Sequence, residues 1–558
     1  MALKNTSKTE KNKPISIYEK FAAFFGSNKL FYVILGVGVF LSIISFNARI
    51  SEAHDDSLYI EAGYRYVHEF PNFFYTSNAP MYPMFLALLT LIFGTNLIVF
   101  KIFSMLFFVL GTIMYYKALD KKVPDLLKHF TLLFLCTNYL IIYYSSQTFS
   151  ESFYMLVQSV FLYYFMNYNF GRNPLTGDYK TEYKKWLTIG FMMMLLTLAK
   201  NILVFGIAAI IMFYVFRKEY KKALLSLISF SLFKILYEVI KNMVWGASAI
   251  QYQSQMGILL NKDPYDATKG QEDFFGFVGR FTNNFGLYLG KRFYQILGFM
   301  DSENTEESYL LAFLVFGLCA YGLYRALKEK QYAITFLLFF AGTISLGTFF
   351  VLQARWDQPR FILVHMPAIL LGIFYGIYKL MEKDNFNQFL FSTLMMLVVC
   401  SMLISSINRG LSNIPIVKKN LSGDIYYGYT PDWRNYLELS AWCKDSLPES
   451  ALVACRKAPM SFVYAKGKHF YPIYSVIAKD TATEQSNPDS VLAIFKRNKV
   501  THIMLASLRL NPKQNTGDII NTVHNIAIPI MNKYPDKMRL VKQIGGDFEP
   551  AALFEIKY

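Results

Sequence analysis

The sequence KLFYVILGVGVFLSIISFNAR (residues 29–49) is followed directly by ISEAHDDSLYIEAG (residues 50–63). The first stretch is apolar and has about the length, roughly 20 residues, that a helix needs to cross a bilayer. It therefore predicts a transmembrane helix. Two adjacent carboxylates, Asp55 and Asp56, then lie at the membrane–water boundary, where acidic side chains are costly to hold without partners. This acidic loop is the first candidate site of the chain.

The composition of the whole chain agrees with a membrane location. Of 558 residues, 54% are hydrophobic and only 17% are charged, more apolar surface than one soluble core can hide. We therefore predict a polytopic α-helical membrane protein. The net charge of +17 is explained by Lys and Arg in short cytoplasmic loops. Nucleic acid is not expected as a partner, because the chain has no aromatic–basic platform or zinc-ligand spacing.

Further apolar runs predict about eleven transmembrane helices in all. They lie near residues 29–49, 97–116, 128–144, 147–167, 186–199, 201–216, 223–242, 306–326, 331–350, 361–380 and 387–407. Residues 81–94 are also apolar, but as a helix they would extend only about 21 Å, short of the hydrocarbon core. We interpret them as a juxtamembrane helix, begun by Pro80 and Pro83 and ended by Gly94.

Basic residues then give the chain an orientation. With 81–94 outside the lipid, the loops that are rich in Lys and Arg all fall on one side, together with the polar, Lys-rich N-terminal tail (residues 1–28). The positive-inside rule makes this side cytoplasmic. We expect an uncleaved first span, because the apolar run is too long for a typical signal peptide. The outer segments are then 50–96, 145–146, 243–305 and everything after residue 408. Within the third of these, interfacial helices are expected over 274–299.

The composition changes near residue 410, where apolar runs end. A helix is expected over 432–446 and another over 489–497, with short strands at 451–455, 500–505, 538–544 and 551–557. This predicts three parts: the tail 1–28, a transmembrane domain 29–409 and a soluble extracytoplasmic α/β domain 410–558. Cys443 and Cys455 lie in the last part, and a disulfide between them is one possibility.

Six polar residues from distant stretches converge on the outer face in this topology. They are Asp55, Asp56, Glu151, Lys200, Arg355 and Arg360. A carboxylate can accept a proton from an attacking hydroxyl, and Arg suits phosphate through paired hydrogen bonds. Plainer interpretations remain for each: Asp at a helix start, an interfacial Glu, a snorkelling Lys, or Arg in contact with headgroups. The convergence itself favours group transfer from a lipid phosphate.

The same motifs, in the same order, resemble the GT-C superfamily of membrane glycosyltransferases, in particular the branch of aminoarabinose transferase and protein O-mannosyltransferase-like enzymes. HDDSLYIEA (54–62) resembles their first-loop acidic motif, although Asp56 stands where Glu is commoner. NAPMYP (78–83) resembles their Pro-started juxtamembrane helix, with Asn78 where a basic residue often precedes it. SESF (150–153), LAKN (198–201), RWDQPRF (355–361) and RKAP (456–459) are similar to the later motifs.

The resemblance implies a function and roles for the candidate residues. Asp55 would be the catalytic base, Asp56 and Glu151 would position the acceptor or a cation, and Lys200, Arg355 and Arg360 would hold a lipid-linked phosphate. A divalent metal is possible but not required, with His54 a weak candidate ligand. The partners implied are a polyprenyl-phosphate-linked sugar donor, a glycolipid, glycan or protein acceptor, and membrane lipids.

We therefore expect a hexosyltransferase-like enzyme of the cell envelope, in the plasma (inner) membrane, with its active site outside the cytoplasm. The alternatives are a transporter of lipid-linked saccharides or a non-catalytic envelope assembly protein. Transporters often show internal repeats and charges at mid-membrane depth, and neither is evident in this sequence. A phosphoethanolamine-type transferase is disfavoured, because no metal-ligand cluster is apparent. The sequence does not name the sugar or the acceptor.

Overall fold

The computed structural model describes most of the chain. The described residues are 20, 23–52, 54–249, 255–264, 269–300, 306–353, 356–363, 365–381, 385–480, 483, 485–509, 520, 522–547 and 549–558. Most of the predicted N-terminal tail, and Arg355 among the candidate site residues, lie outside these ranges.

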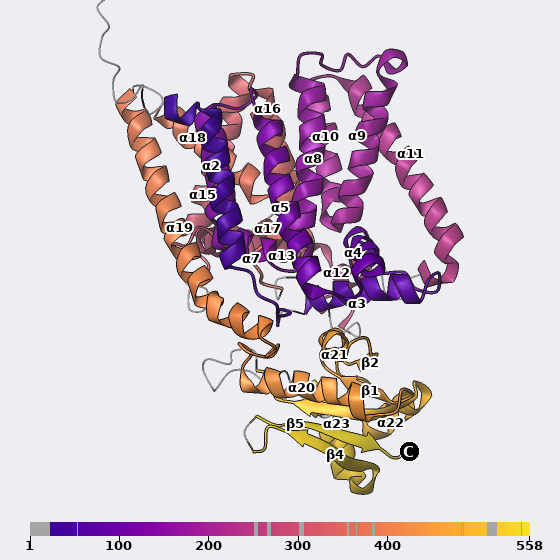
Figure 1. Ribbon diagram of the computed structural model, residues 1–558. Helices are drawn as coiled ribbons and strands as arrows, with labels where there is room; N and C mark the ends of the chain where they lie inside the picture. Colours follow the sequence, from indigo (N-terminus) through magenta and orange to yellow (C-terminus); the bar gives the residue numbers. More distant parts are fainter. Residues whose placement is uncertain are drawn as a thin grey trace, which may run out of the picture.

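A bundle of apolar helices forms the larger part of the molecule (Figure 1). Its members are α2 (Asn28–Ile44), α5 (Leu97–Leu119), α6 (Asp125–Thr137), α8 (Ser150–Phe170), α9 (Tyr179–Ala199), α10 (Val204–Phe216), α11 (Tyr220–Trp245), α15 (Tyr309–Lys328), α16 (Tyr332–Val351), α18 (Met366–Leu380) and α19 (Asn385–Leu421). Nine of the predicted apolar runs each fall on one of these helices, whereas 128–144 is divided between α6 and α7 (Tyr139–Ser145) and 361–380 between α17 (Arg360–Leu363) and α18. In the described part of the chain, five helices are long and apolar enough to cross a membrane, or up to six if each bent pair counts as one span. The chain is a multi-pass membrane protein, and the number of about eleven spans stays a prediction.

One of the predicted spans is broken by a polar residue. Helices α6 and α7 (Tyr139–Ser145) meet at an angle of 61°. Between them, the side-chain oxygen of Asn138 accepts hydrogen bonds from the backbone N–H groups of Leu140 and Ile141, which caps α7 and begins a new helix direction. Its Nδ2 donates to the carbonyl oxygen of Ile296 at 2.5 Å. The bend turns α7 toward the polar end of the bundle.

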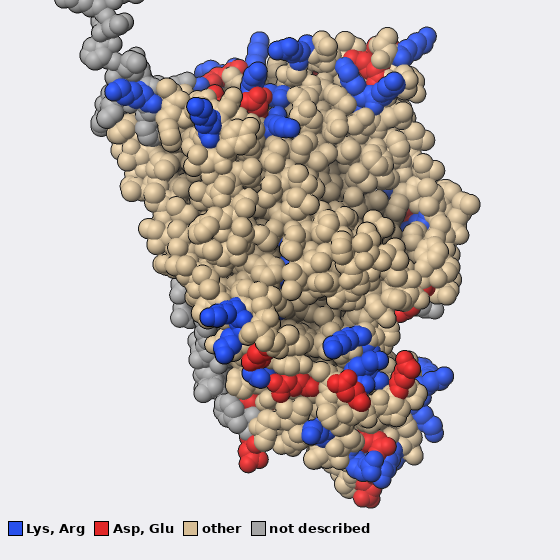
Figure 2. Space-filling model, viewed as in Figure 1, with Lys and Arg blue, Asp and Glu red and all other residues tan. Residues whose placement is uncertain are grey.

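Charge is segregated along the bundle. Figure 2 shows an apolar band on the visible face, with Lys and Arg gathered above and below it. Several short helices lie at the lower end in this view, beside the C-terminal region (Figure 1). They include α3 (Asp55–His68), α4 (Met81–Phe93), α12 (Gln255–Leu260), α13 (Phe274–Leu287), the π-helix η4 (Tyr288–Arg292), α14 (Phe293–Ile296) and α17 (Arg360–Leu363). This end is therefore where the loops expected to face outward come together.

Helix α4 matches the predicted short helix at 81–94. It packs closely on α3 at Gly63, where an added Cβ would come within 2.9 Å of the Leu86 Cβ. Its other side exposes Leu88, Leu91 and Ile92. One face thus packs on α3 while the opposite face is apolar and uncovered, as expected of a helix lying at the lipid surface.

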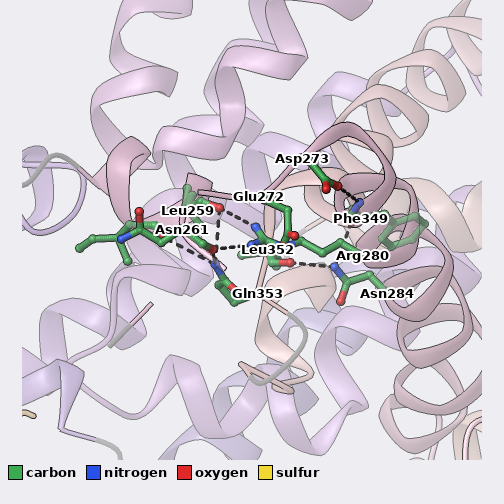
Figure 3. A network of polar contacts seen from close by, with 11 residues as sticks. Leu259, Asn261, Glu272, Asp273, Arg280, Asn284, Phe349, Leu352 and Gln353 are labelled. Atoms are coloured by element: carbon green, nitrogen blue, oxygen red, sulfur yellow. Dashed lines mark hydrogen bonds and ion pairs between the residues drawn. The ribbon is translucent and has the colours of Figure 1, made fainter. Parts of the chain in front are cut away.

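Three side chains connect the segment around α12 and α13 to the end of α16 (Figure 3). They are the guanidinium group of Arg280 and the amide groups of Asn284 and Gln353. Arg280 donates to the carbonyl oxygens of Leu259 and Asn261, both at 2.5 Å, and to Glu272 at 2.8 Å. Asn284 donates to the backbone of the last turn of α16, and Gln353 donates to the Asn261 carbonyl oxygen at 2.7 Å.

The C-terminal region contains a five-stranded sheet in the order β2-β1-β3-β5-β4. Strands β1 (Leu452–Cys455), β2 (Phe470–Pro472) and β3 (Val500–Ala506) are parallel, while β5 (Ala551–Ile556) runs antiparallel to β3 and to β4 (Met538–Ile544). The helices are α20 (Pro431–Ser446), α21 (Ala458–Tyr464), α22 (Pro488–Arg497) and α23 (His524–Lys533). The predicted strands and the two predicted helices are present, whereas β2, α21 and α23 were not predicted. The cap of α22 is Asn487, and Cys443 and Cys455 are both free thiols.

The C-terminal region touches the polar end of the helical bundle directly. Helix α21 packs against α3, and the Tyr429 hydroxyl donates to the Ile50 carbonyl oxygen at 2.5 Å. Residues of both parts share one hydrophobic core. The predicted boundary at residue 410 falls inside α19, which continues to Leu421.

Candidate active site

The acidic loop between α2 and α3 places its two aspartates differently. Asp55 begins α3 and its side chain is 23% exposed, whereas Asp56 is fully buried. Both Asp56 oxygens accept backbone N–H groups, from Ser51 at 2.6 Å and Ser57 at 2.9 Å. Asp56 therefore holds the loop in shape, while Asp55 is the carboxylate that a substrate can reach.

Asp55 is ion-paired with Arg360, the first residue of α17. The guanidinium group also lies 5.8 Å from the centroid of the Phe149 ring. Its Nε is buried and has no hydrogen-bond partner among the residues that the structure describes. Arg360 can therefore still donate to an incoming oxyanion while it faces the candidate base.

A second ion pair joins Glu151, in the first turn of α8, to Lys200, which ends α9. The Lys200 Nζ lies 3.0 Å from Glu151 Oε1, and the Glu151 side chain is 5% exposed. The other carboxylate oxygen, Oε2, has no hydrogen-bond partner within the described ranges. A buried carboxylate oxygen that lacks a hydrogen-bond donor is a place for a hydroxyl or an ammonium group of a ligand.

The two ion pairs belong to one cluster. Arg360 interacts electrostatically with Glu151 as well as with Asp55. The Tyr59 hydroxyl, 3.5 Å from Ser150 Oγ, lies in the field of the same three charges. Burial raises the pKa of Tyr59, and the two carboxylates raise it further, so its phenol stays a neutral hydrogen-bond donor. The structure thus brings together four of the six predicted residues, while Arg355 lies outside the described residues.

Lys101 of α5 is part of the site and was not predicted. It is fully buried and donates to Asn47 Oδ1 at 2.9 Å, to Gln147 Oε1 at 2.6 Å and to the Arg49 carbonyl oxygen. Burial raises the pKa of Asp56 to about 7, against the opposing effects of two backbone N–H groups and the Lys101 charge. A lysine in the first turns of an apolar run was the available signal, because a charge there needs a partner.

Lys457, within the RKAP motif, is a second site residue that the sequence did not predict. It lies between β1 and α21, and its Nζ donates to the Glu52 carbonyl oxygen at 3.3 Å. Burial lowers the pKa of Lys457 to about 8, as does the neighbouring Arg456, while Asp55, Asp56 and Glu52 oppose this. The C-terminal region therefore contributes a cation to the acidic loop.

The candidate metal ligand His54 has a positive φ of 81° and a buried Nδ1 without a hydrogen-bond partner in the described part of the chain. Burial lowers its pKa well below the usual value. Over the described residues, no group of three or more His, Cys, Asp or Glu side chains is arranged to hold a metal ion.

Comparison with known proteins finds a glycosyltransferase family over part of the chain. The Alg9-like mannosyltransferase family matches residues 62–252, which include Glu151 and Lys200. No curated protein sequence matches the chain. The Archaeoglobus fulgidus oligosaccharyltransferase in its apo form is 12% identical, with 86% of this chain and 70% of that chain covered and a TM-score of 0.52.

Two further solved structures are similar. The same A. fulgidus enzyme tethered to an acceptor peptide with the NVT sequon is 13% identical over 92% of this chain and 73% of that chain, with a TM-score of 0.52. ArnT from Cupriavidus metallidurans bound to undecaprenyl phosphate is 10% identical over 94% of this chain and 97% of that chain, with a TM-score of 0.49. The matched family segment and the fold shared with the oligosaccharyltransferase show that this chain resembles the GT-C superfamily of membrane glycosyltransferases, as its motifs indicated.

Proposed function

We propose that the protein is a GT-C-type glycosyltransferase that moves a sugar from a polyprenyl-phosphate donor to an acceptor hydroxyl outside the cytoplasm. The observation that carries this proposal is the cluster in which Asp55 pairs with Arg360 and Glu151 pairs with Lys200. The four residues come from four separate segments at one end of the bundle. Acidic and basic groups side by side suit proton removal next to a leaving phosphate.

Asp55 is assigned as the general base. It takes the proton of the acceptor hydroxyl while that oxygen forms a bond to the anomeric carbon of the donor sugar. The bond between this carbon and the phosphate oxygen breaks, and the phosphate leaves with the electron pair. General base catalysis typically contributes about 10²–10⁴-fold to a rate, and orientation of the two substrates contributes more.

Arg360 and Lys200 are assigned to the leaving phosphate, since both are cations with capacity to donate hydrogen bonds at the cluster. Arg355 is assigned there too, on the resemblance of its motif. Glu151 is assigned to the acceptor through its unpaired oxygen. Asp56, which is buried, is assigned to positioning Asp55 by holding the turn at Ser51 and Ser57. The eleven spans, the outward orientation and the plasma-membrane location belong to this proposal.

The test uses membranes that contain the full-length protein, supplied with a polyprenyl-phosphate donor carrying a radiolabelled sugar. Wild-type protein is expected to transfer label to an endogenous glycolipid, glycan or protein, and Asp55→Asn to abolish transfer at unchanged protein level. Asp445→Asn, an exposed Asp of the C-terminal region, is the matched control and should retain activity. Full activity of Asp55→Asn would remove the base assignment. Movement of labelled lipid without a new glycosidic bond would instead indicate a transporter.

A further inference from the structure

A cavity lies beside the acidic loop. It has a volume of about 310 Å³ and is lined by five residues between 47 and 52, together with Tyr143 and Gln147. None of these residues belongs to the cluster of Asp55, Arg360, Glu151 and Lys200. Consecutive tyrosines of α7 belong to the two places: Tyr143 lines the cavity, while Tyr144 lies in the field of Glu151, Arg360 and Asp55.

Arg49 is the distinctive residue of this cavity. Its Nε and Nη1 are buried and have no hydrogen-bond partner among the described residues. Arg donors that are buried without partners carry a desolvation cost. The guanidinium group is nevertheless held in place, 4.7 Å from the centroid of the Tyr429 ring. A cation that is kept in position with unused donors is prepared for a ligand.

Glycine at position 428 allows this placement. Gly428 has a φ of +94°, and an added Cβ would come within 3.2 Å of the Arg49 Cζ. The segment before α20 can therefore lie flat against the guanidinium group. The C-terminal region closes this side of Arg49 and leaves the cavity as the space in which a ligand can meet it.

The remaining lining favours an anion over a cation. Asn47 and Gln147 both use their side-chain carbonyl oxygens to bind Lys101. The Gln147 amide nitrogen also donates to Ser146 Oγ at 3.4 Å, so the polar groups that the two side chains can still offer are N–H donors of Asn47 and one N–H of Gln147. Lys101 itself adds positive charge behind them. The one carboxylate of the lining is Glu52, whose pKa is raised by burial, in opposition to the Arg49 charge. Lys457 donates to the Glu52 backbone and brings a further cation.

We propose that this cavity is a second anion-binding site, in which Arg49 binds the oxyanion of a phosphate monoester. The planar guanidinium group matches phosphate by two parallel hydrogen bonds. The space exceeds that of one phosphate group, so the phosphate can be attached to a lipid or be free in solution. The site is distinct from the leaving-group position assigned to Lys200 and Arg360, and its ligand binding can be measured whether or not the protein transfers sugar.

The experiment uses the purified full-length protein in maltoside detergent at constant ionic strength. Thermal unfolding is followed while inorganic phosphate or dodecyl phosphate is added. We expect the wild type to be stabilised in a saturable way, and Arg49→Gln to bind the effective probe at least tenfold more weakly. Arg434→Gln, a half-exposed Arg paired with Glu438, is the matched control and should bind as the wild type does. Size-exclusion chromatography checks that each variant is folded.

Arg49→Lys provides a second variant that keeps the charge but lacks the paired donors, and it should also bind more weakly. Stabilisation by inorganic phosphate supports a free ligand, and stabilisation by dodecyl phosphate alone supports a lipid-linked one. The proposal is overturned if neither probe stabilises the wild type, or if Arg49→Gln binds normally. Loss of binding in Arg360→Gln but not in Arg49→Gln would place the phosphate at the Asp55 cluster alone. If Arg49→Gln loses phosphate binding but the wild type transfers no sugar, the anion-binding site is supported and the proposed transferase activity is rejected.

Discussion

The guanidinium group of Arg360 is ion-paired with the carboxylate of Asp55. Asp55 begins α3, after the first apolar helix, and Arg360 begins α17, after α16. This pair joins the start of the bundle to its late part and defines the floor of the candidate site. Because both groups are largely shielded from water, their mutual attraction is stronger than that of a surface ion pair.

A double-mutant cycle across this pair tests whether the two residues act as a unit. Asp55→Asn and Arg360→Gln are each expected to lower the rate of sugar transfer by about 10²-fold or more, the scale of general base catalysis. The double variant should be no slower than the slower single variant, because residues of one catalytic unit are not additive. Rates come from the radiolabelled-donor assay, with Asp445→Asn as the control. Multiplicative losses would show that the two residues contribute independently.

Removal of one partner from the second ion pair should cost stability. Lys200→Met leaves the buried carboxylate of Glu151 without its hydrogen-bonded cation, at an expected cost of about 1–3 kcal/mol. The loss stays moderate because Arg360 still interacts with Glu151. Glu151→Gln combined with Lys200→Met should recover part of the loss, since the unpaired charge is gone. Thermal unfolding in detergent measures both, and equal melting temperatures for the two variants would contradict this prediction.

Lys457 predicts a pH dependence of stability. Burial lowers its pKa to about 8 in the folded protein, whereas an unfolded chain has about 10.4. Between these values the unfolded state binds more protons, so stability that is attributable to Lys457 rises with pH. Below about pH 8 both states are protonated and its contribution is constant. The difference in melting temperature between the wild type and Lys457→Met should therefore shift in favour of the wild type as the pH rises above 8. Lys444→Met, at an exposed position, should show no such trend.

The Arg280 clamp should control the order of the segment that it holds. Arg280→Met removes three hydrogen bonds, two of them to backbone carbonyl oxygens. Amide hydrogen exchange should accelerate in residues 255–264 and 269–273, because their backbone is no longer fixed to α13. Arg434→Met is the control, since its ion pair lies in the C-terminal region. Unchanged exchange near residue 260 would show that the clamp is dispensable.

Topology can be tested by labelling of single cysteines in intact cells. Lys444→Cys and Lys496→Cys are exposed in the C-terminal region, and Lys184→Cys is exposed near the opposite end of α9. In a background without native cysteines, a membrane-impermeant maleimide should label the first two and leave the third unmodified. Labelling of Lys184→Cys alone would reverse the proposed orientation and move the Asp55 cluster to the cytoplasmic side.

The elements of this protein were largely predictable from the sequence. Apolar length marks the helices of the bundle because lipid excludes unpaired backbone polar groups, and the short helix α4 was distinguished by its length and by the side on which the basic loops fall. The C-terminal strands were recognisable as short runs of β-branched and apolar residues between turn signals. The number of spans and the domain boundary were less certain, since polar breaks such as Asn138 interrupt apolar runs and α19 continues through residue 410.

Local composition by itself determined that the chain is a multi-pass helical protein with an acidic first loop, because the solvation of side chains depends on near neighbours in sequence. Only the tertiary structure decided that Asp56 is buried while Asp55 is partly accessible, that Lys101 lies behind them, and that Tyr429 and Lys457 reach the loop from the C-terminal region. Such relations depend on how helices far apart in sequence pack, and no single stretch contains that information.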